Sequence, residues 1–291
     1  MTTDGTHSAV PQPAQLAGSP PPRPRRRYRW VVVTALWAVV VGGAALSAVF
    51  FGGTTSRSQT TISSAVPTVD SAVADLVAAG DSPQAVAAIG GYGQVGDACR
   101  ISLARDGRRY ERDVVFFTAP GTEDALLRQI RARLPARYRA QLSNRAVQPL
   151  RADAGNYVTL IGGTVAAGQV LVVLDTGCRP TGHGVVGAEP TVDLRSTPVE
   201  TVFSALRVTE VRREIHTVAC PGGGTAWTIE AEAPAGGVAL SLADALAGTL
   251  TGVVPVLARP ELYLYRTGRT GVVVRTRNGA VVVTATTGCP G

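Results

Sequence analysis

The chain has 291 residues, of which 45% are hydrophobic and 17% are charged, and its net charge is +7. This apolar content excludes a largely disordered chain and is sufficient for two ordinary domains. All 28 basic residues are arginine, which excludes a Schiff-base lysine, a P-loop lysine and a lysine general base. With its abundant Ala, Val and Gly, the sequence is typical of a GC-rich bacterial genome.

Residues 1–29 form a tail rich in Pro and Arg, with almost no apolar side chains to bury. Segments of this composition do not form a packed core, so we expect a disordered cytoplasmic tail. A Pro-rich tail can dock a partner, but a solvated leader is the simpler interpretation.

A run without charged residues extends from Trp30 to Ser56. It is long enough to cross a bilayer as a helix of about 20 residues, so we expect one transmembrane helix over 30–53. Five arginines precede this run and only Arg57 follows it closely, which places the tail inside and the rest of the chain outside the cytoplasm. A signal peptide cleaved near Ala45-Leu46-Ser47 is the alternative, but the leader and the apolar run are too long for it.

Most of the net charge reflects this topology. Residues 1–29 carry five arginines and one aspartate, a net of +4, and the remainder carries 23 arginines against 20 acids, a net of +3. The high pI therefore does not indicate nucleic acid binding. Aromatic residues make up 5% of the chain, too few for a base-stacking surface.

Two segments that end alike, LVVLDTGCRP (171–180) and VVTATTGCPG (282–291), indicate an internal repeat. Val69 recurs as Val199 after 130 positions, the first cysteines of the two copies are 121 positions apart, and Cys178 recurs as Cys289 after 111. The offset falls steadily along the chain, as expected if the second copy has shorter loops between the same elements.

All four cysteines follow the predicted transmembrane helix, in a compartment that permits disulfides. Four cysteines allow three connectivities, and the repeat selects pairing within copies, Cys99 with Cys178 and Cys220 with Cys289. Each bridge would tie the first strand of a sheet to its last strand.

The predicted fold class is α+β, with two tandem copies of a small antiparallel-sheet and helix module of order α-β-β-α-β-β. In the first copy the strands are CRISLA (99–104) and DVVFFTAP (113–120), and a helix runs from Thr122 to Pro135. The closing hairpins turn at Ala167-Gly168 and Asn278-Gly279. We expect a linker over 54–66, the first repeat over 67–180, a second linker over 181–196 and the second repeat over 197–291.

Asp175-Thr176-Gly177 resembles the catalytic signature of aspartic proteases. Such an enzyme needs two carboxylates that share a proton, whereas the second copy has Thr286 at the equivalent position. A dyad would therefore require a symmetric dimer that brings two copies of Asp175 together. We favour a structural role, in which the side-chain oxygen accepts a hydrogen bond from a neighbouring N–H at the strand end.

Other chemistry finds little support. Cys220 with His216 nearby could form a thiol nucleophile and base, but pairing with Cys289 removes the thiol. The two histidines after the apolar run, His183 and His216, lie far apart, and the cysteines are committed, so we expect no metal site and no cofactor. The glycine-rich stretches follow no dinucleotide or Walker pattern.

The first copy is strongly basic. From Arg100 to Arg151 there are 12 arginines against five acids, a net of +7, whereas residues 197–291 carry eight arginines against seven acids, a net of +1. Such a surface can bind lipid headgroups, an anionic envelope polymer or another envelope protein; the alternative is a solvated helix and hairpin. The candidate anion- or partner-binding residues are Arg105, Arg108, Arg109, Arg112, Arg128 and Arg131.

These observations predict a non-enzymatic, single-pass protein of a bacterial cell membrane, with extracytoplasmic domains that bind or scaffold. An envelope hydrolase, aspartic only if dimeric through Asp175, and an accessory subunit of a membrane assembly are the alternatives.

Overall fold

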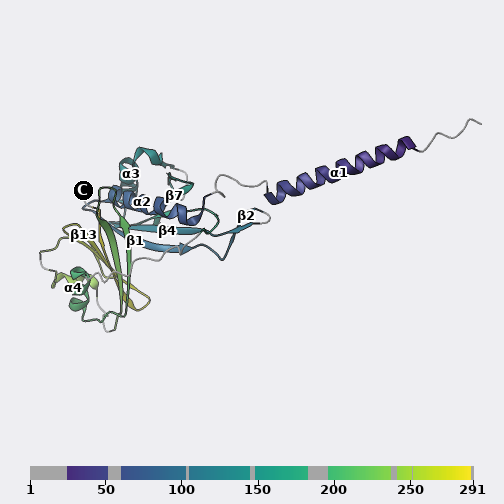
Figure 1. Cartoon of the computed structure of the whole chain (residues 1–291). Helices are drawn as coiled ribbons and strands as arrows, with labels where there is room; N and C mark the ends of the chain where they lie inside the picture. Colours follow the sequence, from purple (N-terminus) through teal and green to yellow (C-terminus); the bar gives the residue numbers. More distant parts are fainter. Residues whose placement is uncertain are drawn as a thin grey trace, which may run out of the picture. The chain divides into compact units, whose positions relative to one another are not determined.

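The computed structural model describes residues 25–51, 60–102, 105–144, 148–182, 196–236, 241–250 and 252–289 (Figure 1). Contacts divide the chain into two units, Met1–Gly52 and Gly53–Gly291. The predicted disordered tail lies outside the described residues up to residue 24. Parts of both predicted linkers, 54–59 and 183–195, also lie outside them.

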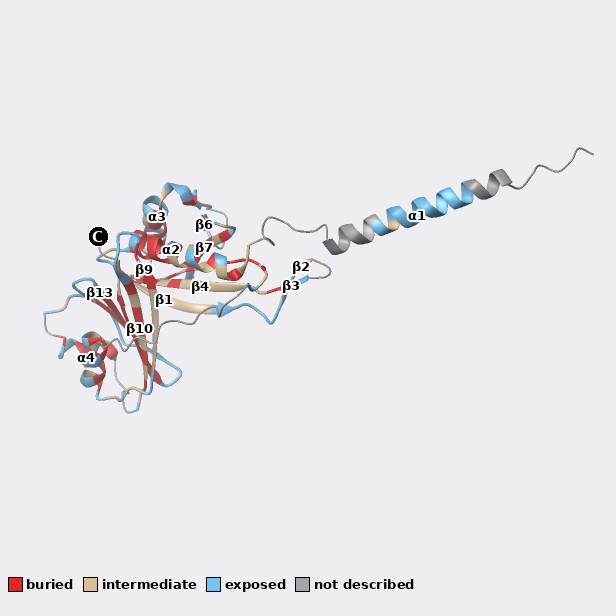
Figure 2. Ribbon diagram, in the orientation of Figure 1, coloured by how far each residue is buried: buried red, intermediate tan, exposed pale blue. Residues whose placement is uncertain are grey.

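The described part of the first unit is helix α1, Arg25–Phe51. Its side chains are described from Trp30 to Gly43, and nearly all of them are exposed (Figure 2). The helix begins five residues before the predicted apolar run, so it includes four of the five N-terminal arginines.

The second unit contains two six-stranded antiparallel sheets. The first sheet has the strand order β1-β4-β8-β7-β6-β5, and a small two-stranded sheet, β2-β3, lies between β1 and β4 in the chain. The strands are β1 (Ala85–Gln94), β2 (Cys99–Ser102), β3 (Arg105–Gly107), β4 (Tyr110–Thr118), β5 (Gln141–Leu142), β6 (Leu150–Gly155), β7 (Val158–Ala166) and β8 (Gln169–Asp175).

The second sheet has the order β11-β12-β13-β14-β10-β9. When the strands of each sheet are numbered in chain order, both sheets have the same spatial order: first, second, sixth, fifth, fourth and third strand. The strands are β9 (Arg212–Ala219), β10 (Thr225–Pro234), β11 (Pro255–Arg259), β12 (Leu262–Thr267), β13 (Thr270–Arg277) and β14 (Ala280–Thr287).

A helix precedes each sheet, and another connects its second and third main strands. These are α2 (Ile62–Gly80) and α3 (Glu123–Arg133) for the first sheet, and α4 (Thr197–Leu206) and α5 (Leu242–Ala247) for the second; a short 3-10 helix, η2 (Ala136–Tyr138), follows α3. Of the helices whose side chains are described along their whole length, α2 alone is long and apolar enough to cross a membrane; the side chains of α1 are described only over Trp30–Gly43, a shorter apolar stretch. Helix α2 is a core helix of the second unit, because its apolar face is buried against the first sheet (Figure 2).

Helix α3 lies where the sequence predicts it, but its N-terminus is stabilised differently. The Thr122 hydroxyl does not cap the helix and instead donates to the Ala119 carbonyl. The Glu123 carboxylate accepts from the backbone N–H groups of Gly121 and Gly168. These charge-assisted bonds hold the pKa of Glu123 below its usual value and join the start of α3 to the β7–β8 turn.

The predicted number of strands is wrong, because each main sheet has six strands rather than four. Residues 99–102 form β2 of the small sheet, and the first main strand is β1, Ala85–Gln94. This strand, AVAAIGGYGQ, is rich in Ala and Gly, which have low strand propensity. The predicted hairpin turns at Ala167-Gly168 and Asn278-Gly279 are confirmed.

Alternating side chains place both sheets between two apolar layers. On β4, Val114 and Phe116 contact the core under α2 and α3, whereas Phe117 points to the other face and meets Val273 of β13. The neighbours of Val273 on β13 instead join the core under α4 and α5. The two sheets thus contact each other through the faces that their helices leave open. At this contact a Cβ on Gly271 would lie 2.6 Å from a Val86 methyl carbon, so glycine permits the close approach.

Each half of the second unit has one disulfide, and the predicted pairing is confirmed. Cys99 bonds to Cys178 and Cys220 to Cys289, with Cα–Cα distances of 5.9 and 5.5 Å. The first bridge joins the chain after β1 to the chain after β8, and both strands flank β4. The second joins the chain after β9 to the chain after β14, which flank β10 in the same way.

We predict that replacing both cysteines of either bridge by serine lowers the free energy of unfolding by about 4 kcal/mol, since each bridge closes a long loop in the unfolded chain. Urea unfolding of the full chain in detergent measures this loss. Peptide mapping under non-reducing conditions tests the pairing, and a peptide linking Cys178 to Cys220 would contradict it.

Candidate functional site

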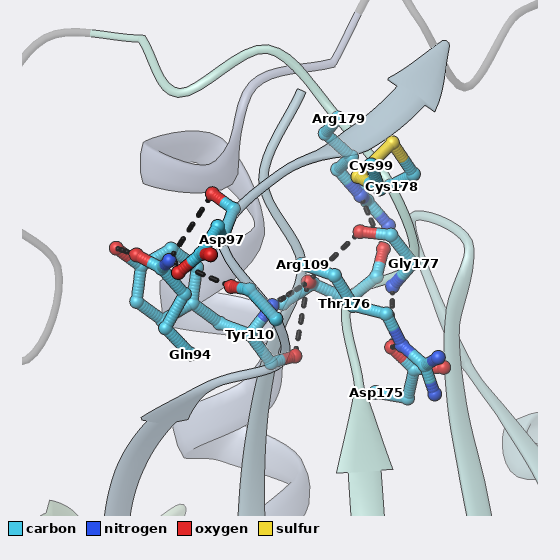
Figure 3. The surroundings of a disulfide bond; sticks show 11 residues. Gln94, Asp97, Cys99, Arg109, Tyr110, Asp175, Thr176, Gly177, Cys178 and Arg179 are labelled. Atoms are coloured by element: carbon cyan, nitrogen blue, oxygen red, sulfur yellow. Dashed lines mark hydrogen bonds and ion pairs between the residues drawn. A yellow bond between two sulfur atoms is a disulfide. The ribbon is translucent and has the colours of Figure 1, made fainter. Parts of the chain in front are cut away.

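The end of β8 next to the first disulfide carries the candidate catalytic aspartate (Figure 3). Asp175 accepts a hydrogen bond from the Gly177 N–H at 2.7 Å and one from Arg109 Nε at 2.9 Å, both on Oδ1. Arg109 also donates to Glu111 Oε1 at 2.6 Å. The hydrogen bond that Arg109 donates to Asp175 raises the pKa of Arg109. Asp175 therefore closes a strand-end turn, as the structural interpretation predicts, and it also binds a guanidinium group, which the sequence did not predict.

The equivalent position in the second sheet is used differently. The Thr286 hydroxyl lies 2.7 Å from the Thr228 hydroxyl, and Thr228 in turn accepts from the Ile89 N–H at 2.9 Å. Both threonines are buried between the sheets. Asp175 and Thr286 thus occupy equivalent strand ends with unlike contacts, and within one chain Asp175 faces an arginine rather than a second carboxylate.

We predict that Asp175→Asn and Asp175→Thr each lower the free energy of unfolding by about 1 kcal/mol or less. Asparagine keeps an acceptor oxygen for Gly177, and Arg109 retains Glu111. Urea unfolding of the full chain checks the magnitude, together with protein abundance in cells. Loss of a cellular function at unchanged stability and abundance would contradict the structural role and support a hydrolase.

A second polar cluster, which we call the Arg112 junction, lies where α2, β1, β4 and β9 meet. Only 2% of the Arg112 side chain is exposed. Its guanidinium donates to Asp70 Oδ1 at 2.6 Å, to the Gly90 carbonyl at 3.0 Å and to the Thr217 carbonyl at 3.1 Å. It also stacks 4.9 Å from the centre of the Tyr92 ring. One side chain of the first sheet is thus bonded to the edge strand of the second.

Burial at this junction shifts the pKa values of two neighbours of Arg112. The Tyr92 hydroxyl donates to Asp70 Oδ1 at 2.6 Å, and burial together with this carboxylate raises the pKa of Tyr92 well above its usual value. Burial also raises the pKa of Asp113, while His216 and Arg112 oppose the increase. His216 lies against Gly91, the neighbour of Gly90 on β1, because a Cβ on Gly91 would lie 2.9 Å from His216 Cε1. These groups form a structural contact between the sheets.

The sequence does not predict this junction, because its charge pattern counts Arg112 toward a basic surface. A signal was available, because Arg112 alternates with Asp113 along β4 and therefore shares a face with Val114 and Phe116. An arginine in phase with buried residues indicates an internal guanidinium. Nothing in the sequence identified Asp70 or Thr217 as its partners, because they come from elements far away in the chain.

We predict that Asp70→Asn lowers the free energy of unfolding by about 3 kcal/mol, because it leaves the Arg112 charge buried without its counter-ion. The double variant Asp70→Asn/Arg112→Met removes both charges and should recover part of that loss. Urea unfolding of the wild type, both single variants and the double variant gives the coupling energy. Strictly additive effects would show that the ion pair does not stabilise the junction.

The six candidate partner-binding arginines do not form one surface. Arg109 and Arg112 are held in the ion pairs described above. Arg105, Arg128 and Arg131 are exposed and Arg108 is partly exposed, and none of these four makes an ion pair with a described residue.

The four remaining arginines lie at opposite ends of α2. Its first residue, Ile62, donates to the Pro180 carbonyl beside the first disulfide and the β2-β3 sheet. Its last turn contacts α3, where Gln129 donates to the Ala79 carbonyl. Since α2 has 19 residues, about 27 Å of helix separates Arg105 and Arg108 from Arg128 and Arg131.

A pocket of about 340 Å³ opens beside Arg128. Its lining carries both an acid and a base, so it has no clear preference for ligand charge. The lining residues are Asp124, Leu127, Arg128, Leu142, Ser143, Asn144 and Pro149.

Within the described ranges, no three His, Cys, Asp or Glu side chains are grouped to hold a metal ion. His183 lies outside the described residues. Cys220 is in a disulfide, so it is not available as the nucleophile considered with His216. In the described part of the chain, Cys220 therefore has a structural role.

Comparison with known proteins gives no further guide to this site. No family model matches the chain, and searches of curated proteins and of solved structures found no match either.

Proposed function

We propose that this chain is a single-pass, membrane-anchored protein of a bacterial cell envelope whose extracytoplasmic part binds or scaffolds another component. The observation that carries the proposal is the exposure of large apolar side chains along α1, with Trp30 70%, Trp37 66% and Val39 72% exposed. A helix of 27 residues is about 40 Å long, and the hydrocarbon core of a bilayer is about 30 Å thick. Lipid is the environment in which such side chains are stable.

The charges and cysteines support the orientation. Five arginines lie at the N-terminal end of the apolar run, which favours a cytoplasmic tail over residues 1–29 and a transmembrane segment over 30–53. Both disulfides lie after this segment, in agreement with an oxidising compartment. Both features support the proposal that residues 54–291 lie on the outer side.

We further propose that residues 67–180 and 197–291 are two copies of one duplicated module. The common strand order, the helices at equivalent places and the equivalent disulfides support this proposal. Because the copies meet through their sheets, a partner would bind to a single body with two unlike halves, of which the first carries the larger net positive charge.

Binding is favoured over catalysis by the roles of the polar side chains. Asp175 closes a turn, Cys220 is oxidised, and Asp70 and Arg112 stabilise the contact between the sheets. An envelope hydrolase would need its reacting groups to converge in a cleft, and a dyad of two Asp175 carboxylates would need a dimer. An accessory subunit of a membrane assembly is compatible with the same binding role.

Protease treatment of intact, wall-stripped cells tests the topology. With a different epitope tag at each end of the chain, we expect protease to remove the C-terminal tag and to spare the N-terminal one, because only the part after α1 is outside. Both tags should disappear after lysis, which is the control. Protection of the C-terminal tag in intact cells would overturn the proposed orientation.

A further inference from the structure

The place where the chain enters the second unit also holds the β2-β3 sheet. The described chain resumes at Thr60, nine positions after the end of α1 at Phe51. There Thr60 accepts a hydrogen bond from Arg179 Nη1 at 3.0 Å. Arg179 pairs through its backbone with Arg108, with N–O distances of 2.8 and 3.0 Å in the two directions. Thr60, the first described residue of the second unit, and the end of β3 are thus joined through one residue.

The disulfide fixes the other strand of the small sheet at the same place. Cys99 begins β2 and bonds to Cys178, the residue before Arg179. The main sheet extends away from this end, and α3 lies far from it in the same unit (Figure 1). The hairpin therefore cannot move far from the point of chain entry without breaking a covalent bond.

This end of the unit is cationic. Arg100 and Arg105 are exposed, Arg108 is partly exposed, and none makes an ion pair within the described ranges. Asp106 is the one acid described in the hairpin, so its net charge is positive. Tyr157, 44% exposed, lies nearby, because the Asn156 carbonyl accepts from Arg179. Arginine and tyrosine together are typical of a membrane interface.

We propose that the β2-β3 hairpin, through Arg100, Arg105 and Arg108, binds anionic lipid headgroups of the membrane that holds α1. The proposal rests on the proposed membrane anchor. Nine residue steps span at most about 30 Å, so an anchored α1 keeps the hairpin within reach of the bilayer surface. Each arginine near an anionic surface strengthens binding about fivefold. The hairpin would hold the second unit in one orientation on the membrane.

The α3 arginines provide a matched control. Arg128 and Arg131 are exposed, as Arg100 and Arg105 are, and they also make no ion pair in the described structure, but they lie at the far end of α2. A free anionic polymer would have access to both ends of the unit. A membrane to which the chain is tethered just before Thr60 would contact the hairpin arginines rather than those on α3. We therefore choose lipid headgroups over a wall polymer.

The test uses the full chain in lipid nanodiscs, either of phosphatidylcholine alone or with added phosphatidylglycerol. Hydrogen exchange is followed over residues 99–108. We expect at least about fivefold slower exchange in the anionic discs, and raised ionic strength should remove the difference. Arg100→Gln/Arg105→Gln should abolish the difference, whereas Arg128→Gln/Arg131→Gln should retain it.

Equal exchange in both kinds of disc, or equal loss of the difference in both double variants, would overturn the lipid proposal. Soluble polyphosphate that protects the hairpin in phosphatidylcholine discs as strongly as phosphatidylglycerol does would overturn the choice of lipid. Exchange over residues 30–51 in the same samples tests the membrane anchor separately from the lipid contact of the hairpin. Protection there with an unprotected hairpin leaves the anchor intact, and rapid exchange there contradicts the anchor itself.

Discussion

The guanidinium group of Arg112 must be neutralised and hydrogen-bonded inside the protein, because only 2% of its side chain is exposed. Its partners come from α2, β1 and β9. The apolar contact between the sheets has Val86, Phe117, Leu264 and Val273 as its buried members. Apolar burial has no direction, whereas a planar guanidinium fixes where its acceptors lie. The Arg112 ion pair and its carbonyl acceptors therefore help to fix how the two halves meet, together with Arg266, which donates to the Ser82 and Ala85 carbonyls and to Asp81.

The second disulfide also stabilises the contact between the two halves. Cys220 is packed with Val218 and Ala226 in the core under α2, rather than in the core under α4 and α5. The end of β9 thus belongs to the first core by packing and to the second sheet by hydrogen bonding. Thr217, whose carbonyl accepts from Arg112, lies three residues before Cys220. A bridge that stabilises one half therefore also fixes the strand end on which the contact with the other half depends.

Features encoded by neighbouring residues could be predicted from the sequence. The turns at Ala167-Gly168 and Asn278-Gly279 and helix α3 were predictable, because local residue chemistry determines them. The disulfide pairs are not local, but the similar endings of segments 171–180 and 282–291 suggested them. Strand β1 was not predictable, because its Ala and Gly residues have low strand propensity and are stabilised by pairing with β4. The Arg112 junction was missed because charge along a window was read as surface charge. Its partner Asp70 is 42 positions away, so only the tertiary fold brings them together.

Helix α2 explains why a single count of arginines was misleading. Its start is bound to the first disulfide and its end to α3, so arginines that are close in sequence are separated by the whole length of the helix. Arg109 and Arg112 are each held in ion pairs with acidic partners, and Arg112 is also buried. With α1 as the proposed anchor, the two ends of α2 are not equivalent, since the chain enters at one of them. Arg100 and Arg105 at that end and Arg128 and Arg131 on α3 should therefore meet different surroundings, although all four are exposed.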